Sequence, residues 1–135
     1  MTHRQQGFPP IDLTTDDSRS RQALLITRLF DRWNLNTNDQ LNLLGLSQKS
    51  RATLGRYRKG NPLSPSRDMQ DRAGWLLSIH KALRLLYPHN PQLRLSWISQ
   101  RNKAFNNLTP LELMKEEGLI GIAKVTRYLD FLRMI

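Results

Sequence analysis

The sequence contains no cysteine, which excludes disulfide bonds and thiolate metal sites. Its three histidines are His3, His80 and His89, and their spacing does not form a ligand cluster. No apolar run approaches the roughly 18 to 20 residues of a membrane span, and the first residues lack the apolar core of a secretory signal. We therefore expect a cytoplasmic protein with no metal, no cofactor and no membrane partner.

Acidic residues are scarce beside basic ones. The chain has 11 acidic and 21 basic residues, and its formal net charge is +10. The excess is concentrated in residues 21–61, where eight basic residues stand against two acidic ones. Most of the eight are arginines, whose planar guanidinium groups suit phosphate. This distribution favours a polyanionic partner over a charge excess that serves solubility alone.

Patterns typical of catalysis are also missing. The paired carboxylates at residues 16–17 and 116–117 fall in a presumed arm and at a helix end, where such groups are normally solvated. Neither His80 nor His89 has hydroxyl and carboxyl neighbours spaced as in a catalytic triad. The segment Gly118-Leu-Ile-Gly121 lacks the Gly-Lys-Ser/Thr ending of a phosphate-binding loop. We therefore expect a protein that is not an enzyme.

Helical periodicity dominates from residue 19 onward, because apolar residues recur at three- and four-residue spacing while alternation with period two is never sustained. The fold class we predict is all-α. A flexible arm at residues 1–18 would precede a helix-turn-helix module at 19–63 and a small helical domain at 64–135. Helices are expected at residues 19–34, 37–44, 48–59, 65–87, 91–100, 109–117 and 120–134.

Polar residues suited to helix N-caps mark five of these starts: Thr37, Ser47, Ser64, Asn90 and Thr109. The last three each precede a proline, which fits the first helical position. Gln40 and Glu112 stand three residues after Thr37 and Thr109, so both pairs predict capping boxes. Gly118 is suited to the end of the helix at 109–117. The side chains of Trp75 and Trp97 are expected in the core.

Residues 41–60, LNLLGLSQKSRATLGRYRKG, have the pattern of a helix-turn-helix: an apolar helix, a turn at Gly45, and a second helix rich in basic residues without an acid. With Ser47 as the N-cap, the first turns of the second helix would present Gln48, Lys49 and Arg51 to base edges. Gln48 would pair with adenine and Arg51 with guanine.

The later basic residues of this helix, Arg56, Arg58 and Lys59, are better placed for the DNA backbone. Its apolar positions Leu54 and Tyr57, together with Leu46 in the turn, are expected to face the core. The alternative interpretation is a basic amphipathic helix that binds phosphate without sequence preference.

The last expected helix carries apolar residues on every face: Leu119, Ile120, Ile122, Val125, Tyr128, Leu129, Phe131, Leu132, Met134 and Ile135. A protein of this size can rarely bury all of them. The pattern therefore favours a surface for dimerisation or for another protein over a purely internal helix.

Together these motifs resemble the Xre/MbcA/ParS antitoxins over about residues 20–133. The resemblance rests on Leu-Leu-Gly-Leu-Ser before a basic helix ending Arg-Lys-Gly, then Trp97, Asn102, and Leu-Thr-Pro-Leu-Glu-Leu-Met followed by Gly118 and Tyr-Leu-Asp. It implies an N-terminal helix-turn-helix that binds the operator DNA of its own operon. It also implies a C-terminal domain that blocks a RES-domain toxin, an enzyme that depletes NAD or attaches ADP-ribose to a protein.

By position, the resemblance implies toxin contacts at Asn102, Phe105, Asn107, Thr109, Pro110, Leu111, Met114, Lys124, Tyr128, Phe131 and Arg133. A competing interpretation, which we favour for Thr109, Pro110 and Leu111, gives these three a capping and core role. We further expect a homodimer within a toxin-antitoxin complex, since two recognition helices about 34 Å apart can read an inverted repeat.

The chain departs from the family pattern at two places. The segment between Ser47 and Arg56 is about two residues longer, and the chain ends Arg-Met-Ile where members often end in glycine. Two other hypotheses stay open. One is a stand-alone helix-turn-helix repressor whose C-terminal domain dimerises, and the other is a basic nucleic-acid-binding protein without sequence preference.

Overall fold

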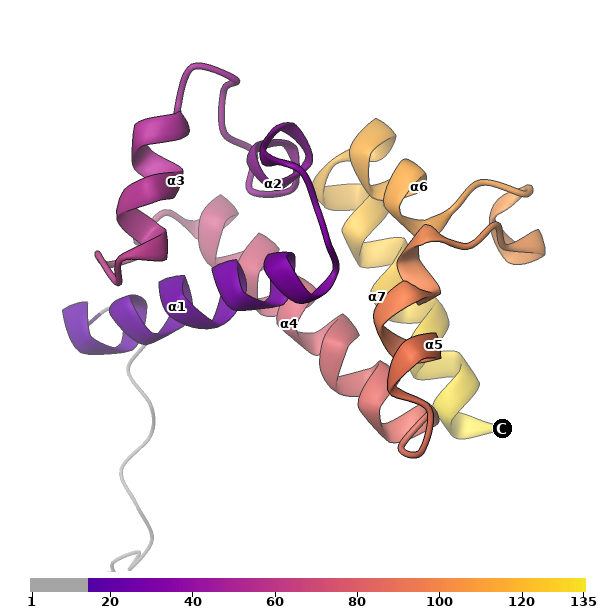
Figure 1. Cartoon of the computed structure of the whole chain (residues 1–135). Helices are drawn as coiled ribbons and strands as arrows, with labels where there is room; N and C mark the ends of the chain where they lie inside the picture. Colours follow the sequence, from indigo (N-terminus) through magenta and orange to yellow (C-terminus); the bar gives the residue numbers. More distant parts are fainter. Residues whose placement is uncertain (1–14) are drawn as a thin grey trace, which may run out of the picture.

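The computed structural model describes residues 15–135, which form seven α-helices, two short 3-10 helices and no strand (Figure 1). The all-α prediction is confirmed. None of the described helices is both long and apolar enough to cross a membrane. The α-helices are α1 (Asp16–Arg32), α2 (Thr37–Leu43), α3 (Arg51–Arg58), α4 (Arg67–Leu86), α5 (Pro91–Ser96), α6 (Pro110–Glu117) and α7 (Leu119–Met134), with 3-10 helices η1 (Trp97–Ser99) and η2 (Lys103–Phe105).

Helix α4 is the centre of the arrangement. In Figure 1 it runs diagonally through the molecule, with α1, α2 and α3 on one side and α5, α6 and α7 on the other. It packs against both α1 and α7. Because one unbroken helix contacts both groups, the division into two modules at residue 63 stays a prediction.

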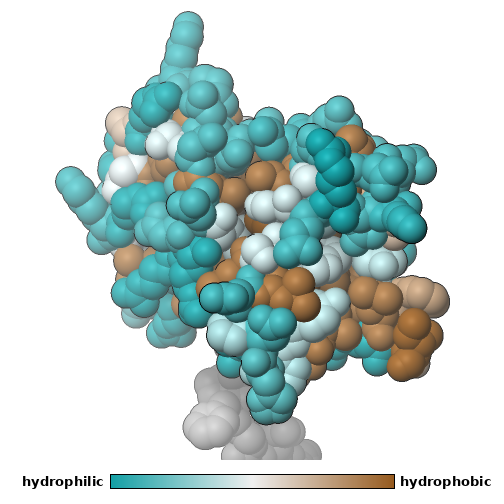
Figure 2. Space-filling view, turned by 45° about the vertical axis from the view of Figure 1, so that its right-hand side comes forward, coloured by the Kyte–Doolittle hydropathy of each residue, from teal (hydrophilic) through white to brown (hydrophobic). Residues whose placement is uncertain are grey.

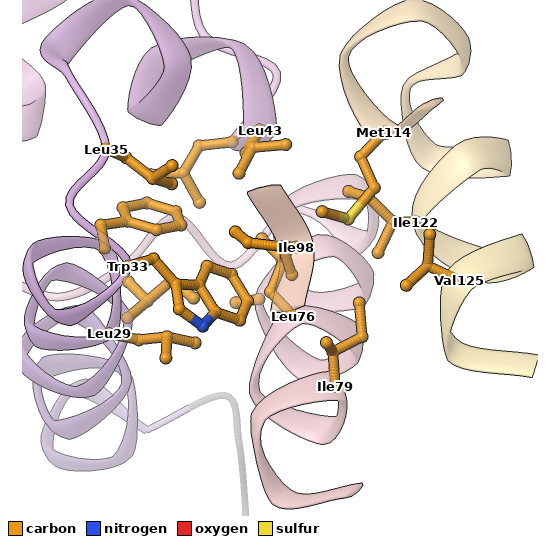
Figure 3. Close-up of a cluster of buried hydrophobic side chains, with 14 of the residues drawn as sticks. Leu29, Trp33, Leu35, Leu43, Leu76, Ile79, Ile98, Met114, Ile122 and Val125 are labelled. Atoms are coloured by element: carbon orange, nitrogen blue, oxygen red, sulfur yellow. The ribbon is translucent and has the colours of Figure 1, made fainter. Parts of the chain in front are cut away.

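The hydrophobic core is continuous across the two groups of helices (Figure 3). Leu76 and Ile79 of α4 are fully buried at its centre. Trp33, which directly follows α1, reaches them from one side, and Ile122 of α7 closes the core from the other. Burial of a side chain of this size contributes about 1.5–3 kcal/mol, so α4 is held by contacts with both ends of the chain.

Near the turn, the predicted N-cap of α2 is wrong by one residue and the predicted start of α3 by three. Asn36, not Thr37, caps α2, because its side chain accepts a hydrogen bond from the backbone N–H of Asp39 at 2.8 Å. Helix α3 begins at Arg51 rather than after Ser47. The Ser47 hydroxyl accepts a hydrogen bond from the backbone N–H of Lys49, which closes a short turn before the helix.

Two further boundaries also differ from the prediction. The expected arm extended to residue 18, but α1 begins at Asp16 with Thr15 as its N-cap, and residues 1–14 of that arm lie outside the described residues. Helix α4 is capped by Ser66, whereas Ser64 accepts a hydrogen bond from the Ser66 N–H. At α4 the actual cap stands two positions after the predicted one.

The remaining predicted caps are confirmed. Asn90 caps α5, and Thr109 with Glu112 forms a capping box at the start of α6. Gly118 follows α6 with φ +62°, a backbone conformation that side chains with a Cβ rarely adopt. Helix α5 ends at Ser96, and the rest of the segment expected to reach residue 100 is the 3-10 helix η1.

Candidate nucleic-acid and protein interfaces

Helix α3 packs on its support through two buried side chains. Leu54 and Tyr57 are 4% and 6% exposed and point into the core, as predicted, while Leu46 in the preceding turn is half-buried against it. Gly45 makes the turn possible with φ +69°, and the guanidinium of Arg72 lies against it and donates to the carbonyl of Leu43. The opposite face of α3 is therefore left to solvent.

The turn before α3 holds two of the three residues that were expected to contact bases. Gln48 and Lys49 precede the helix, and only Arg51 belongs to it, as its first residue. Asn38 in α2 accepts from both Gln48 and Arg51: its backbone carbonyl from the Gln48 amide at 3.4 Å, and its side-chain oxygen from the Arg51 guanidinium at 3.0 Å. Asn38, absent from the predicted site, orients these two side chains.

Arg58 is committed to the protein itself. Its guanidinium donates to both carboxylate oxygens of Asp31 in α1 at 2.8 and 2.7 Å and to the side-chain oxygen of Gln40 in α2 at 2.7 Å. Gln40 is buried and in turn donates to the carbonyl of Leu35. Arg58 therefore joins α3 to both supporting helices and has a positioning role, while its expected phosphate contact stays a prediction.

Four cations of the predicted set have no acidic partner in the described part of the chain: Lys49, Arg51, Arg56 and Lys59. They are exposed on or beside α3, and Arg56 donates only to the hydroxyl of Thr53. Gly55 lies between them in the helix, and a Cβ there would meet nothing within 4 Å. Neither internal packing nor backbone conformation requires this glycine, whose small size allows another molecule to approach the helix closely.

Among the residues expected to contact a protein partner, three at the start of α6 have internal roles. The Thr109 hydroxyl accepts from the Glu112 N–H at 3.0 Å, and the Glu112 carboxylate accepts from the Thr109 N–H at 2.8 Å. This backbone hydrogen bond is the main reason why the pKa of Glu112 lies below its ordinary value, with Arg101 and Lys115 adding to the effect. Pro110 is buried and Leu111 packs against the core, so the capping and core interpretation fits all three.

Phe105 and Tyr128 form an aromatic cluster with Trp97. The Tyr128 ring stacks on Trp97 at a centroid distance of 6.4 Å and meets the edge of Phe105 at 5.1 Å. Trp97 is buried, as predicted, whereas Phe105 and Tyr128 are half-exposed. The cluster fixes the loop before α6 on α7 and leaves one side of both half-exposed rings accessible.

Asn102 and Asn107 shape the loop that carries Phe105. The Asn102 side chain accepts from the Ala104 N–H, and its backbone N–H donates to the carbonyl of Leu108. Asn107 has φ +66°, which asparagine tolerates better than most residues, and its carbonyl accepts from Arg101. Both asparagines thus hold the loop closed, and Asn107 remains exposed.

The last expected contacts divide between core and surface. Met114 is fully buried, so its side chain cannot touch a partner on this surface. Lys124 forms an ion pair with Glu117 at 2.6 Å, and Arg133 lies 3.7 Å from Asp130. Phe131 is 55% exposed.

The end of α7 exposes further apolar side chains next to Phe131. Met134 and Ile135 are each 84% exposed. Figure 2 shows apolar residues gathered at the lower right edge of the face in view. We call Phe131, Met134 and Ile135 the apolar end of α7. An exposed group of this kind is typical of a surface that binds another protein.

A hollow between α4 and α7 was not predicted. Trp75, which we expected in the core, is only half-buried and lines this hollow with Leu119, Ile120, Ala123, Lys124 and Arg127. Ile120 is 66% exposed at its rim. The apolar residues on all faces of the helix were the only sequence signal for this surface.

The fold and its two surfaces define an all-helical protein that combines a helix-turn-helix with a C-terminal protein-binding domain. Residues 14–78 match the family model of the antitoxin Xre-like helix-turn-helix domain, and residues 82–133 match that of the antitoxin Xre/MbcA/ParS C-terminal toxin-binding domain. The chain is also 34% identical over 131 residues to the uncharacterized protein y4oB of Sinorhizobium fredii (strain NBRC 101917 / NGR234), with 96% of each chain covered. The chain belongs to the Xre/MbcA/ParS antitoxin family, which confirms the resemblance found in the sequence.

Proposed function

We propose that this protein is the antitoxin of a cytoplasmic type II toxin-antitoxin system, that it blocks a RES-type toxin by steric occlusion, and that it represses its own operon by binding operator DNA. The observation that carries this proposal is the presence of two separate exposed surfaces on opposite sides of α4. One is the basic face of α3, and the other is the apolar end of α7. The protein acts by binding the toxin and catalyses nothing itself. The toxin is an enzyme that consumes NAD or attaches ADP-ribose to a protein.

The DNA-binding surface consists of the turn before α3 and the exposed face of the helix. Arg51 and Gln48, oriented by Asn38, read base edges, while Lys49, Arg56 and Lys59 contact phosphates. Gly55 lets the helix lie deep in the major groove. Two copies in a homodimer place these helices about 34 Å apart, so the operator is an inverted repeat.

The toxin-binding surface consists of exposed groups on α7 and the adjoining loop. Phe131 and the half-exposed rings of Phe105 and Tyr128 provide apolar contacts, with Asn107, Lys124 and Arg133 as polar neighbours at the edge. Aromatic side chains of this kind contribute much of the free energy of binding in protein interfaces.

A stand-alone repressor is the second candidate, because an exposed apolar end also suits a dimer interface between two copies. Co-expression with the product of the adjacent reading frame separates the two functions. We expect that product to arrest growth when it is expressed alone, and to co-elute with this chain and become harmless when both are present. If it is harmless alone, or elutes separately, the antitoxin function is refuted and the repressor remains.

The toxin-binding surface is tested by Phe131→Asp combined with Met134→Asp. We expect the double variant to lose co-elution and growth protection while it retains its thermal stability. Leu25→Asp, at an apolar residue of α1 that is 45% exposed, is the matched control and should protect fully. Equal protection by all three chains would show that the apolar end of α7 does not bind the toxin.

Operator binding is tested by titrating the DNA upstream of the operon and a scrambled duplex at several salt concentrations. We expect an affinity for the upstream DNA at least about 10³-fold higher, as is usual for specific binding. A ratio below about tenfold would favour the phosphate-binding interpretation of α3.

A further inference from the structure

A pocket between the C-terminal half of α4 and the start of α5 has no role in either proposed surface. It is lined by Leu77, His80, Lys81, Arg84, Leu85, Pro88 and Arg94, and we call it the basic pocket. Residues 77, 80, 81, 84 and 85 recur at three- and four-residue spacing, so they share one face of α4. No acidic residue lines it.

The positive charge of the basic pocket is not compensated within the described part of the chain. Eight other basic residues form ion pairs, but Lys81, Arg84 and Arg94 form none. Like charges at this spacing on one helix repel one another. Cations that lie close together without a counter-charge attract an anion from solution.

Two residues that line the pocket carry buried polar atoms without a hydrogen-bond partner in the described part of the chain. Arg94 donates to the carbonyls of Tyr87 and Pro88, both at 3.2 Å, which fixes its guanidinium, while its Nε atom is buried without a hydrogen bond. Nδ1 of His80 is likewise buried and unpaired. Unsatisfied groups of this kind are rare in folded proteins.

The basic pocket is separate from the basic face of α3. Arg84 lies 17 residues after the start of α4, which corresponds to about 25 Å along the helix. Figure 1 shows α3 and α5 on opposite sides of α4. DNA seated on α3 would therefore not fill the pocket as part of the same contact.

We propose that the basic pocket binds a small phosphate-bearing molecule, a phosphomonoester or a diphosphate. Lys81, Arg84 and Arg94 provide the positive charge and the hydrogen-bond donors for the phosphate oxygens, because guanidinium groups match phosphate geometry. Leu77, Leu85 and Pro88 provide an apolar wall for the organic part, and Leu85 is 54% exposed. This site goes beyond DNA and toxin binding and does not depend on either.

Calorimetry with pyrophosphate and with phenyl phosphate tests the proposal on the full chain. We expect both probes to bind, and the double variant Lys81→Gln, Arg84→Gln to bind at least tenfold more weakly. The matched control is Lys103→Gln with Arg127→Gln, which removes two exposed cations that also lack ion pairs but lie outside the pocket. Equal weakening in both double variants would overturn the proposal, because the binding would then reflect net charge alone.

His80 gives a second readout by NMR. Its pKa is lowered by burial and by Arg32 of α1, Arg84 of α4 and Arg94 of α5, which face it from three helices. A phosphate in the pocket opposes these charges, so we expect pyrophosphate to raise the pKa of His80. A pKa of His80 that does not move, or that moves only with a DNA duplex, would overturn the proposal.

Discussion

Lys115 of α6 forms an ion pair with Asp39 of α2, with 2.8 Å between the ammonium nitrogen and the carboxylate oxygen. The Asp39 side chain is only 14% exposed, so the pair is partly shielded from water and salt. It connects the helix-turn-helix directly to the toxin-binding domain. The ion pair thereby links α6 to the helix that precedes the turn before α3.

A double-mutant cycle measures this connection. We expect Asp39→Asn and Lys115→Gln to be coupled by about 1 kcal/mol in the free energy of urea unfolding, because neighbouring charges in one pair are not independent. The matched control is the pair Arg67 and Asp71, where Arg67 is 94% exposed and the atoms are 3.8 Å apart. Its coupling should not exceed about 0.5 kcal/mol. A coupling of Asp39 with Lys115 no larger than that of the control contradicts the prediction.

Gly121 allows α6 and α7 to pack closely. A Cβ at this position would lie 2.5 Å from the carbonyl oxygen of Leu113 and 3.0 Å from the Cα of Met114. Both are backbone atoms that cannot move aside separately. We expect Gly121→Ala to lower the free energy of unfolding by about 1–3 kcal/mol, the range for an overpacked core.

Gly74 is the matched control for this substitution, because it is also helical but a Cβ there meets nothing within 4 Å. Gly74→Ala should raise the free energy of unfolding by about 0.5–1 kcal/mol through helix propensity. If both variants were stabilised, the contact between Gly121 and α6 would be looser than described.

Arg58 and Lys59 are neighbours in sequence with different roles. Arg58→Gln should lower stability by about 1 kcal/mol, since it leaves the buried oxygen of Gln40 without its donor. Lys59→Gln should change stability by less than about 0.5 kcal/mol. It should instead reduce the slope of log affinity for DNA against log salt by about 0.9, the value for one phosphate contact. The reverse pattern, with Lys59 carrying stability, would contradict this assignment.

The sequence predicted the number and order of the α-helices well because the physical signals are local. Apolar spacing places Leu76 and Ile79 on one face of α4, and the capping box of Thr109 with Glu112 requires only four consecutive residues. Helix starts were less certain where two capping residues compete. Ser64 and Ser66 both suit an N-cap, and only the path of the chain into α4 selects Ser66.

The site was predicted only in part, because a local sequence pattern does not reveal which distant residue a side chain will contact. Arg58 has the same local pattern as Lys59, yet 27 residues separate it from Asp31, which binds it. Likewise, nothing next to Met114 distinguishes a core methionine from an exposed one. A basic helix can thus be recognised from sequence, whereas the division between its binding and its supporting residues depends on the packed structure.

His80 makes stability depend on pH. Its pKa in the folded protein lies below the ordinary value of 6.5, first because of burial and then because of Arg32, Arg84 and Arg94. Between the two pKa values the unfolded chain binds a proton that the folded chain does not bind. The stability that follows from the lowered pKa of His80 should therefore be fully present above about pH 6.5. It should be lost as the pH falls through the folded-state pKa.

Urea unfolding at intervals between pH 5 and 8 measures this slope for the wild type, for His80→Gln and for the control His89→Gln. The carboxyl of Glu112, whose ordinary pKa is 4.5 and is lowered in the fold, titrates below this range. We expect the decrease on acidification to be smaller in His80→Gln and unchanged in His89→Gln. A change in packing at residue 80 would shift the free energy of unfolding equally at every pH. It would therefore not change the slope against pH, which is the quantity compared. Equal slopes in all three proteins would mean that His80 is as easily protonated in the folded chain as in the unfolded one.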